Sequence, residues 1–342
     1  MSASLRPCGG DPRELMGLLE PWLRDGGEPV SIRTSGSTGE PKDVLLSHAA
    51  VTASAHATHE RLGGPGQWLL ALPTTGVAAL QVLVRSMLAG TRPALLDEHD
   101  SLADALRAMD GERRYASLVP TQLHRLAEAG DLGLLAGLDA LLVGGAATSP
   151  ALLARARDAG VTIVRTYGMS ETSGGCVYDG VPLDGVRWRV DSDRRIELSG
   201  ATLFDGYADP VATARVLRDG WLSTDDLGEA DENGRLRVLG RGDDVVVSGG
   251  VNVPLPAVTE ALRGAEGVRD VLAVGVADEE WGTRVVACVV GGAPLDALRD
   301  AVSSAGMPRA WAPRDVLRLD TLPLLPGGKV DRLALRQLAA RG

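Results

Sequence analysis

Short apolar runs alternate with helix-like segments along the first half of the chain, and this alternation most limits how the chain folds. The runs cover residues 30–33, 68–72, 93–96, 116–119, 140–143 and 162–165. Helical patterns of roughly 10–14 residues separate them. Strands joined by helices favour parallel sheets that are covered on both faces. Ligands of such sheets bind beyond the carboxyl ends of the strands, so we expect functional residues there.

The second half of the chain has a different pattern. From about residue 186 it becomes β-rich, with runs at 186–190, 194–198 and 235–239, and a cluster of glycine and aspartate follows at 240–244. The 98 residues beyond this cluster are enough for a separate small domain. Strands are expected there at 245–247, 271–276, 285–290 and 316–319, with helices near 257–262 and 295–302.

Together these patterns predict an α/β fold with two domains. We expect a large N-terminal domain at 1–239 that combines parallel αβ sheets with a β-rich part. A hinge at 240–244 would join it to a small, mobile C-terminal α+β domain at 245–342. The length of 342 residues is itself typical of two domains.

Composition and charge narrow the classes of partner. The net charge of −10 and the pI of about 5.1 argue against a surface for nucleic acid or an anionic membrane. Three scattered cysteines are too few for a disulfide framework or a zinc site, which fits a reducing cytoplasm. The segment 11–14 begins a capped helix rather than a targeting signal. The uncharged stretch at 62–84 is interrupted by proline, glutamine and threonine, so we do not expect it to span a membrane.

One segment of the N-terminal domain is rich in hydrogen-bond donors. It consists of Thr34, Ser35, Gly36, Ser37, Thr38, Gly39, Glu40, Pro41 and Lys42. Small residues let the backbone wrap closely around an anion, hydroxyl and N–H groups donate to phosphate oxygens, and lysine adds charge. The segment lacks the G-x-x-x-x-G-K-[ST] pattern of a Walker A loop. We interpret it as a polyphosphate-binding loop, the alternative being a flexible surface turn.

Two further clusters come directly after expected strands. Gly144, Gly145 and Ala146 follow the run at 140–143, where glycine lets a flat ligand approach the backbone. The second cluster follows the run at 162–165 and consists of Tyr167, Gly168, Met169, Ser170, Glu171 and Thr172. It combines an aromatic ring for base stacking with hydroxyls for phosphate and a carboxylate. Because Mg²⁺ needs only one or two carboxylates beside phosphate oxygens, Glu171 alone is a sufficient candidate ligand.

Two clusters later in the chain are ambiguous when each is taken alone. The segment 221–226 reads as an acidic turn beyond a strand, where Asp226 either accepts both ribose hydroxyls or faces solvent. The segment 326–332 holds Lys329 on a Gly-Gly loop. Such a loop either carries the amine into a site or is an ordinary basic loop before the last helix.

Taken in order, the clusters closely resemble the core motifs of the adenylate-forming superfamily, the acyl-CoA synthetases and their relatives. The resemblance extends from about Ser31 to Arg332, nearly the whole chain. Only 33 residues precede the donor-rich loop, where the superfamily usually has a longer N-terminal subdomain. With the segments 72–73, 80–86 and 174–180, this makes the chain most similar to the short actinobacterial o-succinylbenzoate–CoA ligases of menaquinone synthesis.

The resemblance implies a two-step reaction. A carboxylate attacks the α-phosphorus of ATP to give an acyl-adenylate and pyrophosphate, and the thiol of CoA then displaces AMP. It implies a triphosphate site made of Thr34, Ser35, Gly36, Ser37, Thr38, Gly39, Lys42 and Thr172, with Mg²⁺ on Glu171. It implies a nucleoside site made of Gly144, Gly145, Ala146, Tyr167, Gly168, Met169, Ser170, Asp226 and Arg241. Lys329 would bridge the carboxylate and the α-phosphate, Asp243 would be the hinge, and Gly249 and Gly250 would line the path of CoA.

The chain departs from the family pattern near the acyl substrate. Thr75 and Gly76 stand where the similar ligases often carry histidine or an aromatic residue. The second carboxylate of o-succinylbenzoate needs a cation or several donors, and the candidates are Thr74, Thr75, Gln81, Arg85 and Ser173. Arg85 lies on an apolar helical stretch, so a structural role is an equal alternative. His56 and His59 are expected on a solvated helix face.

Three functions stay open at the level of sequence. The first is a CoA ligase acting on o-succinylbenzoate as its small-molecule carboxylic acid. The second is an adenylating enzyme that delivers another acid to CoA, a carrier-protein thiol or an amine, as Thr75 and Gly76 would allow. The third is a non-catalytic nucleotide-binding module, against which Glu171 and Lys329 speak, because binding alone needs neither. A homodimer is one open alternative for the oligomeric state.

Overall fold

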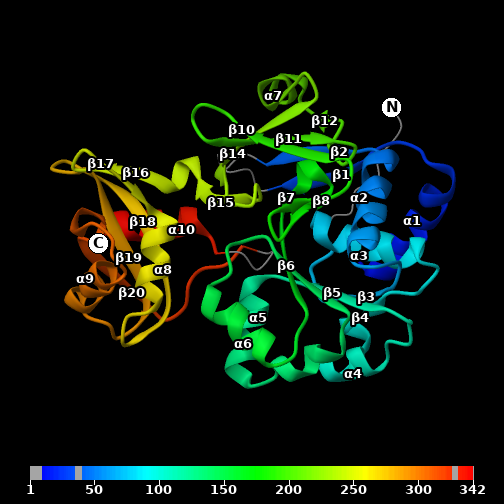
Figure 1. The fold of residues 1–342 in the computed structure, drawn as a ribbon, viewed down its shortest axis with the longest axis horizontal. Helices are drawn as coiled ribbons and strands as arrows, with labels where there is room; N and C mark the ends of the chain where they lie inside the picture. The colour runs from blue at the N-terminus through cyan, green and yellow to red at the C-terminus, as the bar shows by residue number, and fades with distance from the viewer. Residues whose placement is uncertain (1–9, 35–40, 326–329, 342) are drawn as a thin grey trace. The chain divides into compact units, whose positions relative to one another are not determined.

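The computed structural model describes residues 10–34, 41–325 and 330–341 (Figure 1). The chain divides into two compact units. Unit 1 comprises Met1–Asp191, Glu197–Thr224 and Ala230–Arg237, and unit 2 comprises Ser192–Ile196, Asp225–Glu229 and Val238–Gly342. The short segments Ser192–Ile196 and Asp225–Glu229 therefore belong to unit 2, and from Val238 onward the whole chain does.

A seven-stranded sheet forms the centre of unit 1. Its order is β4-β3-β5-β6-β7-β8-β9, in which the first five strands are parallel and the last two are antiparallel. The strands are β3 (Gln67–Leu70), β4 (Ala94–Leu95), β5 (Arg114–Leu118), β6 (Ala140–Gly144), β7 (Ile163–Met169), β8 (Gly174–Tyr178) and β9 (Val181–Pro182). The predicted parallel sheet is thus confirmed for five of the six apolar runs.

Helices cover both faces of this sheet, as the alternating pattern predicts (Figure 1). On one face lie α1 (Pro12–Asp25), α2 (His48–Arg61) and α3 (Val77–Leu88), and on the other α4 (Leu102–Arg107), α5 (Pro120–Ala129) and α6 (Pro150–Asp158). The 3₁₀ turns η1 (Leu96–Glu98) and η2 (Leu132–Gly137) complete this part. Leu69, Leu123 and Leu141 belong to the buried cluster that joins the second group of helices to the strands. The burial of such side chains stabilises the layers by about 25 cal/mol per Å² of apolar surface.

Helix α1 begins where its sequence predicts. The carboxylate of Asp11 accepts a hydrogen bond from the backbone N–H of Arg13 at 2.8 Å, and Pro12 occupies the first turn. The helix buries Trp22, whose ring meets His48 of α2 edge to face with the centroids 5.1 Å apart. This contact fixes α1 on the helices beneath it.

The run at 30–33 does not join the parallel sheet. It forms β1 (Val30–Thr34), which pairs antiparallel with β2 (Lys42–Leu46), and β12 (Gly206–Tyr207) pairs with the same strand. The prediction of a parallel strand is wrong here, because a short apolar strand has the same pattern in either kind of pairing. The register places Thr34 opposite Lys42 at the loop end of this hairpin. The donor-rich segment therefore connects the two strands.

The β-rich part forms a five-stranded sheet in the order β10-β11-β14-β13, with β15 also paired to β14. The strands are β10 (Val186–Val190), β11 (Arg195–Gly200), β13 (Leu217–Arg218), β14 (Trp221–Ala230) and β15 (Leu236–Arg241). Helix α7 (Pro210–Val216) precedes β13. The turn predicted at 221–226 is wrong, because these residues begin strand β14. Leu222 and Thr224 are buried there and alternate with less buried neighbours, which is the period of a strand.

The end of unit 2 forms the expected set of strands and helices. The hairpin β16 (Val245–Ser248) and β17 (Val251–Pro254) follows the turn η4 (Gly242–Asp244). The remaining elements are α8 (Leu255–Arg263), β18 (Val268–Asp278), β19 (Gly282–Gly291), α9 (Leu295–Ser304), η5 (Arg309–Trp311), β20 (Asp315–Leu319) and α10 (Arg332–Arg341). Strand β19 is central and has buried side chains on both faces: Val285 and Val289 belong to one core, Val286 and Val290 to another.

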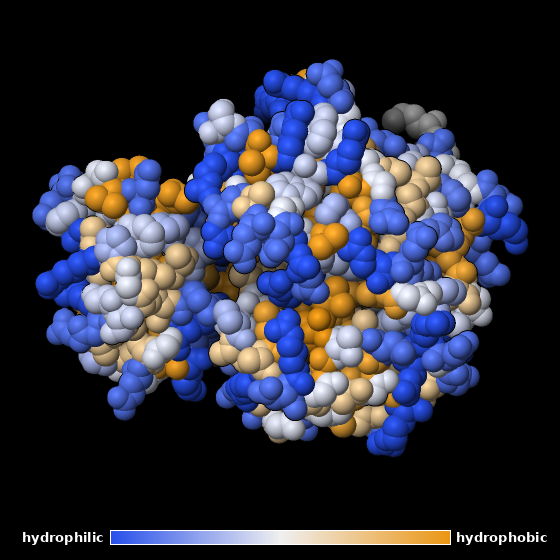
Figure 2. All heavy atoms as spheres, in the orientation of Figure 1, coloured by the Kyte–Doolittle hydropathy of each residue, from blue (hydrophilic) through white to orange (hydrophobic). Residues whose placement is uncertain are grey.

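Figure 2 shows hydrophilic side chains over much of the face drawn, together with a contiguous hydrophobic area on unit 1. The exposed large hydrophobic side chains come from separate elements, among them Leu18 of α1, Val211 of α7, Val247 of β16 and Leu333 of α10. Hydrophobic residues scattered in this way are ordinary on a protein surface. Within the described part of the chain, no helix has the length and apolar character that crossing a bilayer requires.

Candidate functional site

The hairpin of β1 and β2 carries the predicted triphosphate residues. Thr34 and Lys42 face each other across the ladder, and the hydroxyl of Thr34 donates to the carbonyl oxygen of Lys42 at 3.3 Å. The other predicted residues of this loop, Ser35, Gly36, Ser37, Thr38 and Gly39, lie outside the described residues. The two strands therefore fix both ends of the predicted loop.

Glu171 lies in a 3₁₀ turn, η3 (Ser170–Thr172), between β7 and β8. The buried hydroxyl of Thr172 accepts a backbone N–H of β7 at 2.9 Å and donates to the carbonyl oxygen of Gly174 at 2.7 Å. Ser173 adopts a left-handed conformation with φ of 52°, and its buried hydroxyl donates to a backbone carbonyl at 2.9 Å. Both hydroxyls thus hold the turn that presents Glu171.

Tyr207 of β12 connects the predicted metal ligand with the predicted phosphate lysine. Its hydroxyl donates to Oε1 of Glu171 at 2.8 Å, and the Nζ of Lys42 lies 5.1 Å from its ring centroid, a cation–π contact. No sequence motif indicates Tyr207, which lies 36 residues after Glu171 on a two-residue strand. Only the scarcity of tyrosine, four in the chain, could have drawn attention to it.

The predicted adenine site contains two glycines at which the paired strands leave no room for a side chain. A Cβ on Gly144 would lie 2.2 Å from Oγ1 of Thr166, its partner on β7. A Cβ on Gly168 would lie 2.1 Å from the carbonyl oxygen of Gly174. Real Cβ atoms do not approach other atoms so closely, so both positions require glycine for the strands to pair.

The residues predicted to follow β6 lie at the end of that strand, whereas Tyr167, predicted to follow β7, lies within it. Gly145 and Ala146 follow β6 and are exposed at the strand end, as predicted, and Gly145 has a φ of +84° that favours glycine. Tyr167 instead lies inside β7, so the prediction that this strand ends at Arg165 is wrong. The strand continues to Met169 because it pairs with β8, a partner that the apolar run does not reveal.

In unit 2, Asp226, which is predicted to bind the ribose hydroxyls, lies beside Arg241. Asp226 of β14 is mostly buried, and its Oδ1 is 3.8 Å from Nη1 of Arg241. The exposed Asp225 next to it pairs with Nη2 of Arg241 at 3.4 Å and with Nη1 of Arg195 at 2.9 Å. Asp225 therefore binds both arginines.

The predicted hinge residue Asp243 lies in the turn η4. The carboxylate of its neighbour Asp244 is 4% exposed and pairs with Arg332, the first residue of α10. Lys329 precedes Arg332 by three positions and lies outside the described residues. The Asp244–Arg332 pair thus connects the predicted hinge to α10.

The predicted glycines of the CoA path form the turn between β16 and β17. Gly249 and Gly250 have φ values of 57° and 78°, a conformation that favours glycine. A Cβ on Gly249 would lie 2.8 Å from the ring of Trp281, whose carbonyl oxygen accepts the N–H of Gly249 at 2.9 Å. The close packing of this turn on an indole ring requires glycine at Gly249.

Arg85 of α3 is a buried cation that lacks a carboxylate partner among the described residues. Its side chain is 3% exposed, donates to the hydroxyl of Tyr178 at 3.4 Å and lies 4.9 Å from the ring centroid of Trp68. Burial lowers the pKa of Arg85, because desolvation disfavours the charged form. Its Nε and the Oε1 of Gln81, one helical turn earlier, have no hydrogen-bond partner in the described part of the chain. This face of α3 therefore holds a buried donor and acceptor that are both unsatisfied.

His59 does not lie on a solvated face, although His56 does. His59 is 6% exposed, and its Nε2 accepts a hydrogen bond from the indole N–H of Trp68 at 3.3 Å. Burial, and then the charge of Arg85, lower the pKa of His59 to about 4. The prediction of a solvated pair fails for His59 because Trp68 belongs to a separate strand that the helical spacing does not indicate.

Acidification should destabilise the protein through His59. The imidazole has an ordinary pKa of 6.5 and a native pKa of about 4, so between these values the unfolded state binds more protons. The contribution of His59 to the free energy of unfolding is then fully present above pH 6.5. It falls by roughly 3 kcal/mol as the pH drops toward 4. Urea unfolding at several pH values measures the slope. His59→Gln should flatten it, whereas His56→Gln should not, and an unchanged slope in His59→Gln would contradict the assignment.

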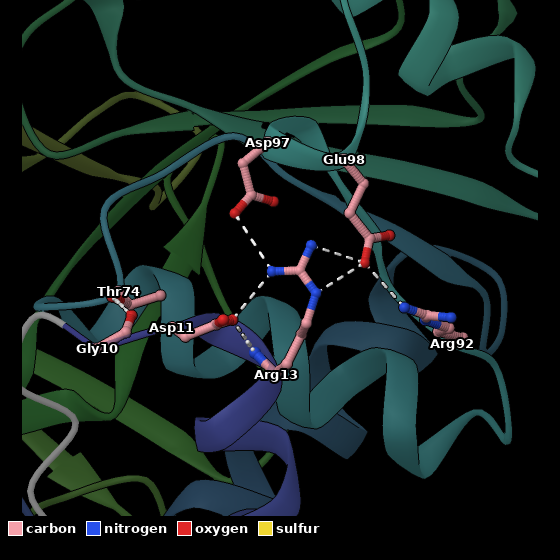
Figure 3. A network of polar contacts seen from close by, with 7 residues as sticks. All are labelled: Gly10, Asp11, Arg13, Thr74, Arg92, Asp97 and Glu98. Atoms are coloured by element: carbon pink, nitrogen blue, oxygen red, sulfur yellow. Dashed lines mark hydrogen bonds and ion pairs between the residues drawn. The ribbon is translucent and has the colours of Figure 1, made fainter.

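The predicted acyl residues Thr74 and Thr75 lie in the loop between β3 and α3. Thr75 is exposed, and the hydroxyl of Thr74 donates to the carbonyl oxygen of Gly10 at 2.9 Å (Figure 3). The segment after Gly10 is anchored by Arg13, which contacts three carboxylates: those of Asp11, Asp97 and Glu98. The N-terminal segment thus holds this loop at the hydroxyl of Thr74.

Comparison with known proteins gives two kinds of match. The family model "AMP-binding enzyme" matches residues 30–209, and "AMP-binding enzyme C-terminal domain" matches residues 257–329. A "Probable 2-succinylbenzoate--CoA ligase" of Mycobacterium tuberculosis is 48% identical over 318 residues, which cover 89% of this chain and 82% of the relative.

Solved structures agree with the sequence matches. The o-succinylbenzoate CoA synthetase of Bacillus subtilis in complex with its acyl-adenylate intermediate has a TM-score of 0.78 and 27% identity, covering 90% of this chain and 68% of that one. The same synthetase in complex with ATP and magnesium ion has a TM-score of 0.77 and 26% identity, covering 90% and 69%. The order of motifs, the fold and these matches agree, and the chain belongs to the AMP-binding enzyme family, the adenylate-forming superfamily.

Proposed function

We propose that this chain is an AMP-forming acid–thiol ligase that activates o-succinylbenzoate with ATP and transfers the acyl group to CoA. A carboxylate oxygen of the acid attacks the α-phosphorus and pyrophosphate leaves. The thiol sulfur of CoA then attacks the acyl carbon and AMP leaves. The observation that carries the proposal is the 48% identity, over nearly the whole chain, to a probable 2-succinylbenzoate–CoA ligase.

The triphosphate is assigned to Thr34, the loop residues Ser35 to Gly39, and Lys42. The acid and the triphosphate are both anions, so fixed donors and cations must neutralise charge before the two can react. The hairpin supports this role, because its register holds Thr34 and Lys42 at the two ends of the loop. Thr172 contributes by closing the turn that presents Glu171.

Glu171 is assigned to a magnesium ion that accompanies the triphosphate. Mg²⁺ is usually held by one or two carboxylates together with phosphate oxygens and water, rather than by an all-protein cage. The residues fit this pattern: Oε2 of Glu171 has no partner among the described residues, and these contain no cluster of three or more potential metal ligands. When bound, the ion supplies positive charge to the phosphate oxygens.

The nucleoside is assigned to the ends of β6 and β7 and to β14. Gly144, Gly145 and Ala146 would face one side of the adenine and Tyr167 the other, with Gly168, Met169 and Ser170 beside them. Asp226 would accept the ribose hydroxyls. Arg241 is assigned to the same site, and its contacts to Asp225 and Asp226 support this by holding the guanidinium beside the carboxylate proposed to bind ribose.

The second carboxylate of the acid is assigned to Arg85, with Gln81 beside it. A buried cation without a counter-charge is costly, and an anionic group that enters the site would offset that cost. The unsatisfied Nε of Arg85 and Oε1 of Gln81 support this assignment. Thr74, Thr75 and Ser173 remain proposed members of the same pocket.

The remaining assignments concern the small domain. Lys329 would bridge the attacking carboxylate and the α-phosphate in the first step. Rotation at Asp243 would then withdraw Lys329 and admit CoA past Gly249 and Gly250, whose turn requires a glycine backbone. A cytoplasmic location and a homodimer stay predictions.

Incubation with ATP, Mg²⁺, CoA and o-succinylbenzoate tests the proposal directly. We expect mass spectrometry to detect the CoA thioester together with AMP, and the acyl-adenylate alone when CoA is omitted. A panel of other carboxylates in a pyrophosphate-release assay is the control for substrate class. Release with a different acid but not with o-succinylbenzoate would overturn the substrate. No release with any acid would favour a nucleotide-binding module without catalysis.

A further inference from the structure

The backbone of Tyr207 is fixed from two sides. Strand β12 pairs with β2, so that Tyr207 lies opposite Val44 in the strand that begins with Lys42. The N–H of Tyr207 donates to the hydroxyl of Thr213 at 2.8 Å. These contacts give Tyr207 a defined place relative to Lys42.

The ring of Tyr207 is fixed as well. It packs edge to face against Phe204, with the centroids 5.0 Å apart, and Phe204 is buried. The N–H of Phe204 donates to the carbonyl oxygen of Glu171 at 2.9 Å. The same short segment therefore positions the ring and holds the backbone of the turn that carries Glu171.

The polar contacts of Tyr207 connect two opposite charges that do not pair with each other. Its hydroxyl donates to Oε1 of Glu171 at 2.8 Å, a charge-assisted hydrogen bond that occupies one carboxylate oxygen. Its ring face lies 5.1 Å from Nζ of Lys42. No ion pair between Lys42 and Glu171 occurs in the described part of the chain.

We propose that Tyr207 is a positioning residue that keeps Lys42 and Glu171 apart and orients each toward its own ligand, an inference that rests on the proposed function. The hydroxyl holds Oε1, so that Oε2 is directed to the metal ion. The ring gives Lys42 a partner that is weaker than a carboxylate, so the amine stays available for phosphate. Without the ring, Lys42 and Glu171 could neutralise each other.

The affinity for ATP with and without Mg²⁺ tests this inference at equilibrium. Isothermal titration with ATP in EDTA and then with ATP and excess Mg²⁺ gives the factor by which the metal tightens binding. In Tyr207→Phe, which keeps the ring, we expect this factor to fall about 10-fold, as for other partners of metal ligands, with metal-free binding within about 2-fold of wild type. In Tyr207→Leu, which also loses the ring, metal-free binding should weaken by a further 5- to 10-fold.

Two further variants make the outcomes distinct. Tyr115→Phe is the matched control. Among the described residues, the hydroxyl of Tyr115 donates to the carbonyl oxygens of Leu62 and Gly64, each at 3.1 Å. Its loss should leave unchanged the factor by which Mg²⁺ tightens ATP binding. Glu171→Gln is the reference for losing the metal ligand. If Glu171→Gln keeps the wild-type factor, the metal assignment itself fails. If Glu171→Gln abolishes the factor and Tyr207→Phe keeps it, only the role of Tyr207 is overturned. Thermal unfolding without ligand verifies that each variant is folded.

Discussion

Replacing Lys329 by alanine should slow pyrophosphate release by about 10²–10³-fold, or roughly 3–4 kcal/mol. The proposed role of the amine is to hold the attacking carboxylate against the α-phosphate, where negative charges approach each other. A fixed cation that is present only in the adenylation geometry stabilises that transition state more than the bound substrates. The loss should therefore appear in kcat for adenylation, measured by pyrophosphate release with saturating ATP and acid.

The second half-reaction is the internal control for Lys329. Thioester formation from supplied acyl-adenylate and CoA should be largely spared, because we propose that the lysine is withdrawn before that step. Lys42→Ala is the matched variant, and its expected effect is a higher KM for ATP rather than the same loss in kcat. Near-normal adenylation by Lys329→Ala would contradict the assignment.

Arg85→Met should lower kcat/KM for o-succinylbenzoate by about 10²–10³-fold. Removing one partner of a buried charge pair typically costs about 2–5 kcal/mol, because the other charge is left desolvated and unpaired. The free protein should lose little stability, since Arg85 has no carboxylate partner among the described residues and methionine fills a similar volume. Steady-state kinetics and urea unfolding measure the two effects separately.

The matched substrate for this test is 4-oxo-4-phenylbutanoate, the same acid without the carboxylate on the ring. Arg85→Met should use it as well as the wild type does, so that the preference for o-succinylbenzoate disappears. Arg92→Met, which removes an exposed arginine bonded to Glu98, should leave both substrates unaffected. An equal loss for both acids would show that Arg85 supports only the fold.

The sequence predicts most of the strands because their apolar runs are continuous. It fails where pairing depends on a partner distant in sequence. The run at 30–33 has the same pattern for parallel and antiparallel neighbours, and β7 extends to Met169 only because β8 pairs with it. At 221–226 the buried Leu222 and Thr224 alternate with less buried residues only in the folded structure. The mostly polar residues of this segment show no apolar alternation in the sequence, so the strand is not predicted there.

The candidate site shows the same division. Motif residues such as Glu171 and Asp226 are recognisable because their chemistry is visible in one short segment. Tyr207 and His59 depend on contacts between separate elements: Tyr207 with Glu171, and His59 with Trp68. No local pattern encodes those contacts, so neither the role of Tyr207 nor the burial of His59 can be predicted from the sequence of one element.

Residue usage supports the two lysine assignments independently. Lys42 and Lys329 are the only lysines in the chain, and apart from five histidines the other basic side chains are arginines. Arginine presents a planar fork of donors, whereas lysine is a compact charge on a flexible stem. A chain that uses arginine almost everywhere else has kept lysine at the two places where a compact charge is proposed to meet phosphate.

The ladder between β1 and β2 also limits where this chain can change length during evolution. Side chains alternate between the two faces of a strand, so one residue inserted between Val44 and Leu45 would turn Lys42 and the buried Val44 to the opposite face relative to the rest of β2. An insertion between Ser35 and Pro41 lies outside the ladder and leaves the pairing of Thr34 with Lys42 intact. Length variation among relatives is therefore compatible with the connecting segment and incompatible with the strand that follows it.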